Sequence, residues 1–436
     1  MKRRRKGHQK SSGQSLIDVA MIVKNEEAHI ADCLRSVKAL RPLLGRICVY
    51  DTGSTDRTVE LARAEGAIVR EGYWDDDFSR ARNESLAMTS AIWVLWIDAD
   101  ERLVVDIERL AVVLRMTAQA PRLEAGWLIN KMADDPGGAV QARALRILRN
   151  KAATFVGRVH ERPMRVEDGC PLQPFTLPER IIHLVHHGYT SETIEGKLHR
   201  NLALAENYVE RLRAGQPTDE ELSTALLDRG RTHAGLGRRA EAEADLEEVL
   251  TLQAHSAVRA EAACRLAEFQ LMDDHPDEAL GFLKAIETGA EENSHVRWLR
   301  GRALHAKQEF AEALEIIRSV DRPTTPQGYM APWREVLLLR MELAARQGHT
   351  EEALSAGLAL ATRHGGAHVV AGLMIALWGK KEASQLAVLL AQASQDYDAD
   401  VEAAFANHSE SGRLVAQEYR SHWGRPANAT PTGRTT

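Results

Sequence analysis

The chain has 436 residues, of which 44% are hydrophobic and 27% are charged. That length is enough for two or three domains, and the composition excludes a disordered or fibrous protein. Lysine and arginine total 56 against 62 acidic residues, which gives a formal net charge of -6. This balance gives no general case for a nucleic-acid partner.

Cysteine spacing and hydropathy exclude further classes. The four cysteines are Cys33, Cys48, Cys170 and Cys264. They form no CxxC pair and no short cluster with histidine, which argues against a disulfide scaffold and a zinc finger. No stretch reaches the roughly 18 apolar residues of a membrane span. The basic N-terminus resembles the start of a signal peptide, but Asp18 and Lys24 interrupt the apolar run that follows it. We therefore expect a disordered N-terminal tail and a cytoplasmic protein.

The first half of the chain alternates between short apolar strands and amphipathic helices. The expected strands are 16–23, 46–50, 67–70 and 92–97, and the expected helices are 28–40, 56–65 and 78–90. This alternation predicts an α/β domain with a parallel sheet covered by helices. Ligands of such sheets bind beyond the carboxyl ends of the strands. The polar clusters KNEE, DTGSTD and DADE each follow an expected strand directly, so all three are predicted to lie at that edge.

From about residue 195 the strand signals end, and an alanine- and leucine-rich helical period runs nearly to the C-terminus. Alanine anchors recur at Ala242, Ala279, Ala313, Ala353 and Ala383. Their spacing is close to the tetratricopeptide unit of about 34 residues, which predicts degenerate helical repeats stacked into a solenoid. The expected domains are a disordered basic tail at 1–15, an α/β domain at 16–194, all-α repeats at 195–423 and a disordered tail at 424–436.

The strongest candidate site is WVLWIDADE. An expected strand delivers Asp98 and Asp100 at its carboxyl end, and strand alternation lets both carboxylates point to the same side. Adjacent carboxylates repel each other unless a cation lies between them, so the pair predicts Mg²⁺ or Mn²⁺. A polar turn is the structural alternative for a lone DxD. Asp51, at the end of the second strand, is an acceptor suited to a base N–H or to sugar hydroxyls.

Four segments resemble, in order and spacing, the family 2 glycosyltransferases of the GT-A fold. They are MIVKNEEAHIADCLRSV, VYDTGSTDRTVELAR, DDDFSRARNESL and WVLWIDADERL. The resemblance covers residues 16–105 strongly and continues more weakly through RALRILRN, GRVHE and HHGY. With its tetratricopeptide-like repeats, the chain is similar to the subgroup that includes glycocin S-glycosyltransferases, which glycosylate peptide side chains. The resemblance implies a GT-A domain with a Rossmann-like mixed sheet, followed by the repeats.

The resemblance also implies roles for individual residues. The implied nucleotide-sugar-binding residues are Ile22, Val23, Lys24, Asn25, Asp51, Arg82, Asp98 and Ala99. The implied metal ligands are Asp98, Asp100 and His186. Lys24 stands where many relatives carry an aromatic side chain that stacks on uracil, and this departs from the family pattern.

Glycosyl transfer with inversion needs a carboxylate that deprotonates the acceptor. Similar enzymes place this base in a short acidic motif after the DxD strand, and GRVHE nominates Glu161, with His160 beside it. Arg162 stands where such a motif continues with aspartate. Asp134 and Asp135 are the reserve candidates, and an ion pair between His160 and Glu161 is the structural alternative.

These observations predict a metal-dependent inverting glycosyltransferase. It would move a sugar from a nucleotide-sugar, with UDP as the expected nucleotide, to a peptide or protein side chain. The helical repeats are expected to recruit that acceptor or a second copy of the enzyme. Two alternatives stay open: a glycan or lipid-linked acceptor, and a catalytically inactive scaffold whose repeats bind peptides.

Overall fold

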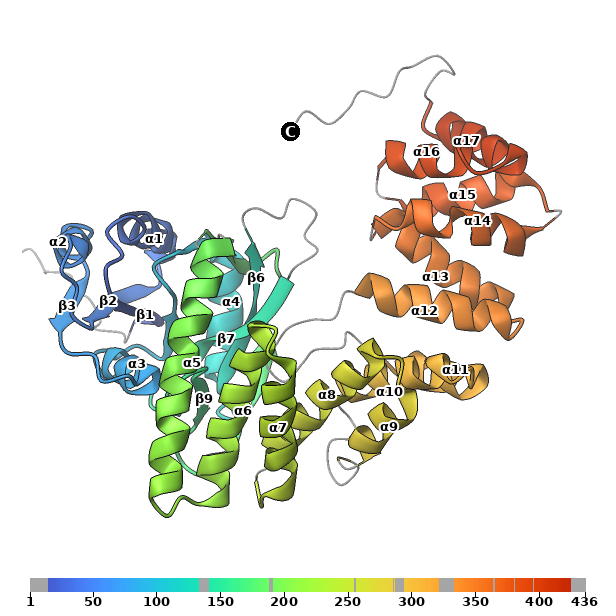
Figure 1. Ribbon diagram of the computed structural model, residues 1–436. Coiled ribbons are helices and arrows are strands. Elements are labelled where there is room, and N and C mark those ends of the chain that lie inside the picture. Colours follow the sequence, from blue (N-terminus) through green and yellow to red (C-terminus); the bar gives the residue numbers. More distant parts are fainter. Residues whose placement is uncertain are drawn as a thin grey trace, which may run out of the picture. The chain divides into compact units, whose positions relative to one another are not determined.

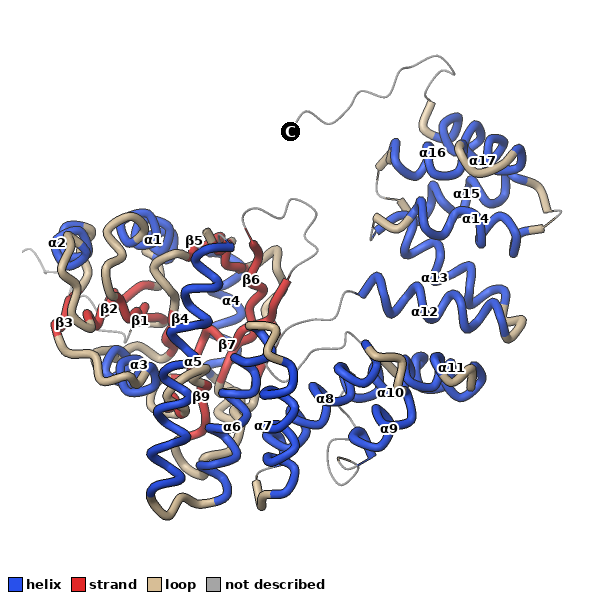
Figure 2. Tube along the Cα trace, in the orientation of Figure 1, coloured by secondary structure: helices blue, strands red, loops and turns tan. Residues whose placement is uncertain are grey.

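The computed structural model describes residues 15–132, 141–187, 191–254, 256–284, 286, 294–320, 333–363, 365–379, 381–394 and 396–424. The chain forms two compact units whose boundary falls between Val258 and Arg259. In the part that the structure describes, every strand belongs to the first unit and the second unit is helical (Figure 2). None of the described helices is both long and apolar enough to cross a membrane.

A mixed sheet forms the centre of the first unit. The strands are β1 (Ile17–Val23), β2 (Leu44–Asp51), β3 (Ile68–Glu71), β4 (Trp93–Trp96), β5 (Glu101–Val105), β6 (Ala125–Met132), β7 (Gln141–Arg149), β8 (Ala153–Val156), β9 (Arg162–Arg165), β10 (Pro174–Thr176) and β11 (Ile182–His186). The sheet runs in the order β3-β2-β1-β4-β7-β6-β11-β5, with β10 paired to β6, while β8 and β9 form a separate antiparallel pair. Strands β3, β2, β1 and β4 are parallel, and β7 is antiparallel to both β4 and β6. The mixed α/β sheet confirms the fold class predicted for the N-terminal domain.

Helices cover both faces of the parallel strands. They are α1 (Ile30–Val37), η1 (Lys38–Leu40), α2 (Thr58–Ala64), α3 (Phe78–Ala87) and α4 (Ile107–Ala118). Figure 1 shows α1 and α2 on one face of β1–β3 and α3 on the other. Helix α1 buries Ile30, Leu34 and Val37 completely, at the spacing that brings apolar side chains onto one face of a helix. With helices on both faces, β1 is buried along nearly its whole length, as expected of a parallel strand in such a sheet.

The first unit extends beyond the sheet into three helices. They are α5 (Ser191–Ala214), α6 (Asp219–Gly235) and α7 (Arg239–Thr251). Gly230 of α6 lets α7 approach closely, because a Cβ there would lie 3.2 Å from the Cβ of Asp245. The compact unit therefore includes helices that are predicted above to belong to the repeat domain from residue 195.

The second unit continues the helical array. Its helices are α8 (Ser256–Met272), α9 (Pro276–Lys284), α10 (Ser294–Ala306), α11 (Phe310–Arg318), α12 (Trp333–Arg346), α13 (Thr350–Arg363), α14 (Ala367–Trp378), α15 (Ala383–Ala393), α16 (Ala399–Ala406) and α17 (Glu410–His422). Consecutive helices pack as pairs, such as α10 with α11 and α12 with α13. The predicted anchors Ala279, Ala313 and Ala353 are completely buried, so the small side chains do allow close helix packing. The helix-rich C-terminal region predicted from these alanines is confirmed.

Candidate active site

The carboxyl ends of β1 and β2 lie side by side, because Val23 pairs with Asp51 in the parallel register. The Asp51 carboxylate accepts hydrogen bonds from the backbone N–H groups of Gly53 and Ser54, both at 3.0 Å through Oδ2. Gly53 has a φ of 107°, a left-handed conformation that favours glycine. Asp51 is 3% exposed, and its Oδ1 has no hydrogen-bond partner among the described residues. A buried acceptor of this kind is suited to an incoming N–H or O–H donor.

Asn25 joins the loop after β1 to the loop after β2. Its backbone N–H donates to Ser54 Oγ at 2.9 Å, and its Oδ1 accepts the backbone N–H of Thr55 at 2.8 Å. Asn25 has a φ of 55°, which asparagine tolerates better than most residues. Its side chain therefore holds the two loops together and is absent from the cavity lining described next.

A cavity of ≈420 Å³ opens at this edge of the sheet. It is lined by Ile22, Val23, Lys24, Glu26, Thr52, Trp74, Phe78, Arg82, Asp98, Ala99, Asp100, His160, Glu161, His186, Lys197, Arg200 and Asn201. Nine of the predicted site residues line it: Ile22, Val23, Lys24, Arg82, Asp98, Ala99, Asp100, Glu161 and His186, the last from the end of β11. Asp51 immediately precedes the lining residue Thr52.

Two buried arginines hold Asp98. Arg82 donates to Asp98 Oδ1 at 2.8 Å, and Arg146 donates to Oδ2 from both terminal nitrogens at 3.3 Å. Burial alone would raise the pKa of the Asp98 carboxyl, but the two guanidinium groups hold that pKa well below its usual range. Both arginines also lie against the Trp96 ring, with their Cζ atoms 4.2 and 3.8 Å from its centroid. Asp98 is therefore ionised and fixed in place.

Glu101 supports this arrangement without lining the cavity itself. It is completely buried and accepts hydrogen bonds from Arg146 at 2.6 Å, from Asn130 Nδ2 at 2.7 Å and from the backbone N–H of Asp98 at 2.9 Å. All three partners donate, so the carboxylate orients both Arg146 and the main chain of the DAD segment.

Asp100 faces a histidine and a lysine. His186 Nε2 lies 3.4 Å from Asp100 Oδ1, and Lys197 Nζ lies 3.3 Å from Oδ2. Burial lowers the pKa of His186, although the negative charge of Asp100 acts in the opposite direction. A neutral imidazole is the form that ligates metal ions.

The predicted metal ligands fit a divalent cation in part. Among the described residues, no three His, Cys, Asp or Glu side chains form a preassembled metal cluster. The oxygen, oxygen and nitrogen donors of Asp98, Asp100 and His186 suit Mn²⁺ or Mg²⁺ chemically. Asp100 and His186 already lie side by side, whereas both oxygens of Asp98 are engaged by Arg82 and Arg146. Asp100 is also engaged, by Lys197, but by one cation where Asp98 has two, so Asp100 and His186 fit a metal ion better than Asp98 does.

Glu161 lines the cavity from the segment between β8 and β9. Its Oε1 accepts a hydrogen bond from Arg82 Nε at 2.7 Å, so Arg82 bridges Glu161 and Asp98. His160 does not pair with Glu161 here: its Nε2 lies 3.1 Å from Thr232 Oγ1 on α6, and burial lowers its pKa to about 3. The reserve candidates Asp134 and Asp135 lie outside the described residues.

Several cavity residues were missed by sequence reasoning. Trp74 and Phe78 form an edge-to-face pair with centroids 4.7 Å apart. Burial, together with the negative charge of Asp100, raises the pKa of Glu26 to about 7. Lys197, Arg200 and Asn201 come from α5. The signal for these three was the polar face at positions i, i+3 and i+4 of an otherwise alanine- and leucine-containing helix.

Comparison with known proteins gives a family match in the first unit. Residues 18–119 match the family described as Glycosyl transferase family 2. The SPbeta prophage-derived glycosyltransferase SunS of Bacillus subtilis is 29% identical over 205 residues, which are 46% of this chain and 46% of SunS. A TPR repeat-containing protein of Synechococcus elongatus is 33% identical over 136 residues, or 31% of this chain and 32% of that protein. The chain thus matches less than half the length of these relatives.

Among solved structures, glucosyl-3-phosphoglycerate synthase from Mycobacterium tuberculosis, in complex with Mn²⁺, UDP-glucose and phosphoglyceric acid, is 25% identical. That match covers 29% of this chain and 46% of the synthase, with a TM-score of 0.23. The TPR protein YrrB is 20% identical, with coverage of 38% and 76% and a TM-score of 0.28. At these TM-scores neither likeness establishes a function. The match of residues 18–119 confirms the predicted resemblance of the N-terminal part of the chain to family 2 glycosyltransferases.

Proposed function

We propose that the protein is a metal-dependent inverting glycosyltransferase that uses a nucleotide-sugar donor, with UDP as the nucleotide, and a peptide or protein side chain as acceptor. One observation carries this proposal. A single cavity at the carboxyl ends of β1, β2 and β4 is lined by Arg82, both DAD aspartates, Glu161 and His186, and it adjoins the loop of Asp51. These groups supply the contacts that a base, a diphosphate, a metal ion and an acceptor proton each need.

The donor would bind across the edge of the sheet. The free Oδ1 of Asp51 suits an N–H of the nucleobase, and the main chain at Ile22–Lys24 forms the neighbouring wall. Asp100 and His186 would hold a divalent cation, with Asp98 beside them. A cation held there would neutralise the negative charge that develops on the diphosphate as it leaves.

Glu161 is the proposed general base. The acceptor atom attacks the sugar C1 from the face opposite the diphosphate, and its proton passes to the Glu161 carboxylate. The bond between C1 and the diphosphate oxygen breaks with its electron pair on the oxygen, so the nucleoside diphosphate leaves and C1 inverts. Because Arg82 donates to Glu161, this role requires Arg82 to turn away from Glu161 when the donor is bound.

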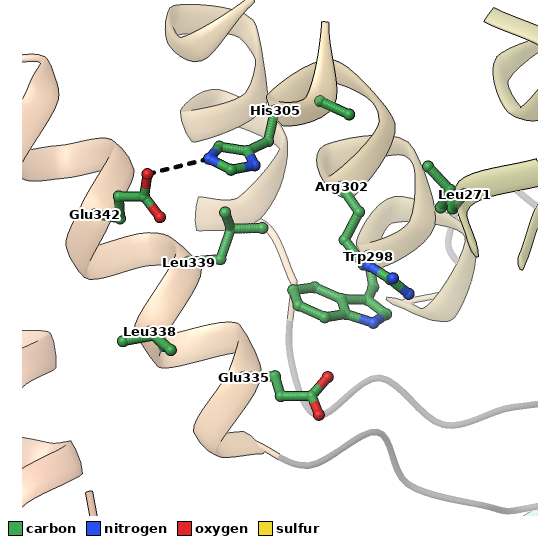
Figure 3. A pocket seen from close by; sticks show the side chains of 9 residues that line it. Leu271, Trp298, Arg302, His305, Glu335, Leu338, Leu339 and Glu342 are labelled. Atoms are coloured by element: carbon green, nitrogen blue, oxygen red, sulfur yellow. Dashed lines mark hydrogen bonds and ion pairs between the residues drawn. The ribbon is translucent and has the colours of Figure 1, made fainter. Parts of the chain in front are cut away.

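The helical repeats support a peptide acceptor. Tetratricopeptide arrays bind peptides on surfaces formed by stacked helices. In the second unit, a cavity of ≈330 Å³ is lined by α10 and α12, together with Leu271 of α8 (Figure 3). It combines the apolar Trp298 and Leu338 with the charged Arg302 and Glu335. Such a lining suits a peptide segment with both apolar and charged side chains.

Donor binding tests the proposal directly. Asp51→Asn preserves the size of the side chain and the fold but replaces one acceptor oxygen by an amide donor. We expect UDP affinity, measured by calorimetry, to fall about tenfold or more. Asp32→Asn is the matched control, since Asp32 is an exposed partner of Arg35 on α1. Equal UDP affinity in the parent and in Asp51→Asn would contradict the assignment of Asp51.

A further inference from the structure

Helix α5 is fixed against the catalytic domain by several contacts. The guanidinium Cζ of Arg158 lies 5.3 Å from the ring centroid of Tyr208 on α5. Helix α5 packs along α6, and α6 in turn contacts the segment around β9 through the His160–Thr232 bond and through Arg162, which donates to Thr224 Oγ1 at 3.3 Å. Helix α5 is therefore held against the rest of the first unit by Arg158 and, through α6, by the segment around β9.

This helix turns one basic face toward the cavity. Lys197, Arg200 and Asn201 all line it, and positions i, i+3 and i+4 share one face of a helix. Lys197 lies 3.3 Å from Asp100, beside the proposed metal site. Arg200 lies over the Phe78 ring, with its Cζ 5.3 Å from the centroid. The two cations are thus one helical turn apart along the cavity wall.

The other cavity cations have different positions or partners. Arg82 is shared between Asp98 and Glu161. Lys24 belongs to the loop after β1, next to the proposed binding site of the nucleobase. Among the described residues Arg200 forms no ion pair with a carboxylate, and its guanidinium donates to Asn201 Oδ1 at 3.3 and 3.1 Å. Arg200 can therefore turn to a bound anion without giving up an ion pair.

We propose that Lys197 and Arg200 of α5 bind the diphosphate of the donor and stabilise it as the leaving group. This inference rests on the proposed function and assigns the helical region a part in the transfer itself, in addition to acceptor binding. A diphosphate offers several anionic oxygens, and charge-assisted hydrogen bonds from lysine and arginine are the strong contacts for such groups. Lys197 would exchange Asp100 for a phosphate oxygen when a cation occupies Asp100.

The test compares a diphosphate with its nucleoside. Affinities for UDP, GDP, uridine and guanosine would be measured in the presence of Mn²⁺ for the parent, Lys197→Ala and Arg200→Ala. Arg211→Ala is the control, since Arg211 is an exposed residue of the same helix outside the cavity. Alanine is the best helix former, so none of these changes weakens α5. Circular dichroism would check that the variants and the parent have equal helicity.

We expect each cavity variant to bind the diphosphate about tenfold more weakly and the nucleoside unchanged. Arg200→Lys, which keeps the charge, should recover part of the loss. Diphosphate affinity within twofold of the parent, or an equal loss for nucleoside and diphosphate, would overturn the role of α5 and leave the proposed function standing. A parent that binds none of the four compounds would overturn the proposed function and this inference with it.

Discussion

Removing the guanidinium of Arg82 should destabilise the sheet of the first unit more than any surface substitution. Arg82 is 6% exposed and makes two short charge-assisted hydrogen bonds, at 2.8 Å to Asp98 and 2.7 Å to Glu161. Such bonds are each worth roughly 1.5–3 kcal/mol. Arg82→Met replaces the guanidinium, whose Cζ lies over the Trp96 ring, by an uncharged apolar side chain, so Glu161 loses its cation while Asp98 keeps Arg146. We therefore expect a loss of about 3–5 kcal/mol, typical of a broken buried pair.

Because the chain has two compact units, a single unfolding transition would not isolate this effect. Native-state hydrogen exchange of amides in β1 and β4 measures the opening free energy of the sheet itself. Arg82→Lys should lower this opening free energy by about half as much, since one ammonium replaces a guanidinium fork that reaches both carboxylates. Arg70→Met is the control: Arg70 pairs with Glu84 at 3.0 Å with both side chains about half exposed, and such pairs contribute at most about 1 kcal/mol. An opening free energy of Arg82→Met within about 0.5 kcal/mol of the parent's would show that the Arg82 bridge between Asp98 and Glu161 does not stabilise the sheet.

Three further predictions concern the proposed general base Glu161, the stability of the protein at low pH and the packing of two helices. Glu161→Gln should abolish transfer yet keep UDP affinity within about threefold; full turnover would exclude Glu161 as the base. Burial lowers the pKa of His160 to about 3, against about 6.5 when unfolded, so the unfolded chain binds a proton first and stability falls as pH drops below 6.5. Asparagine tolerates the left-handed backbone at position 160. Between pH 6.5 and 5, the His160→Asn variant should therefore lose about 2 kcal/mol less free energy of unfolding than the parent. The same dependence of stability on pH in both proteins would contradict this. Gly412→Ala places a Cβ 2.2 Å from the Phe405 carbonyl oxygen and should cost about 1–3 kcal/mol in amide exchange of α16 and α17, whereas Gly281→Ala, where nothing lies within 4 Å, should be neutral or slightly stabilising.

The sheet and its functional edge could be predicted because their signals are local. Each parallel strand is a short apolar run, and the polar residues that follow it, such as Asp51 and Asp98, mark its carboxyl end. Parallel pairing then brings these ends together without further information. In the same way, the spacing of Ala279, Ala313 and Ala353, which are buried, predicted the packing of the C-terminal helices.

The contacts that organise the cavity could not be predicted because they join distant parts of the chain. Arg82 and Glu161 are 79 residues apart, and Asp100 and Lys197 are 97 apart. Nothing in the sequence near Arg146 indicates that it pairs with Asp98 and Glu101, since that depends on the antiparallel register of β7 beside β4. Because α5 was predicted to belong to a separate repeat domain, the contact of its Lys197 with Asp100 was not expected.

The most direct test of the account measures nucleotide release. The protein would be incubated with UDP-glucose, UDP-GlcNAc and GDP-mannose, each with Mn²⁺ and with EDTA, and the freed nucleoside diphosphate would be quantified. Asp100→Asn and Asp32→Asn would be measured alongside as the site variant and the surface control. We predict Mn²⁺-dependent release from at least one UDP-sugar, lost in Asp100→Asn and kept in Asp32→Asn. No binding or release with any donor, or full release by Asp100→Asn, would contradict it.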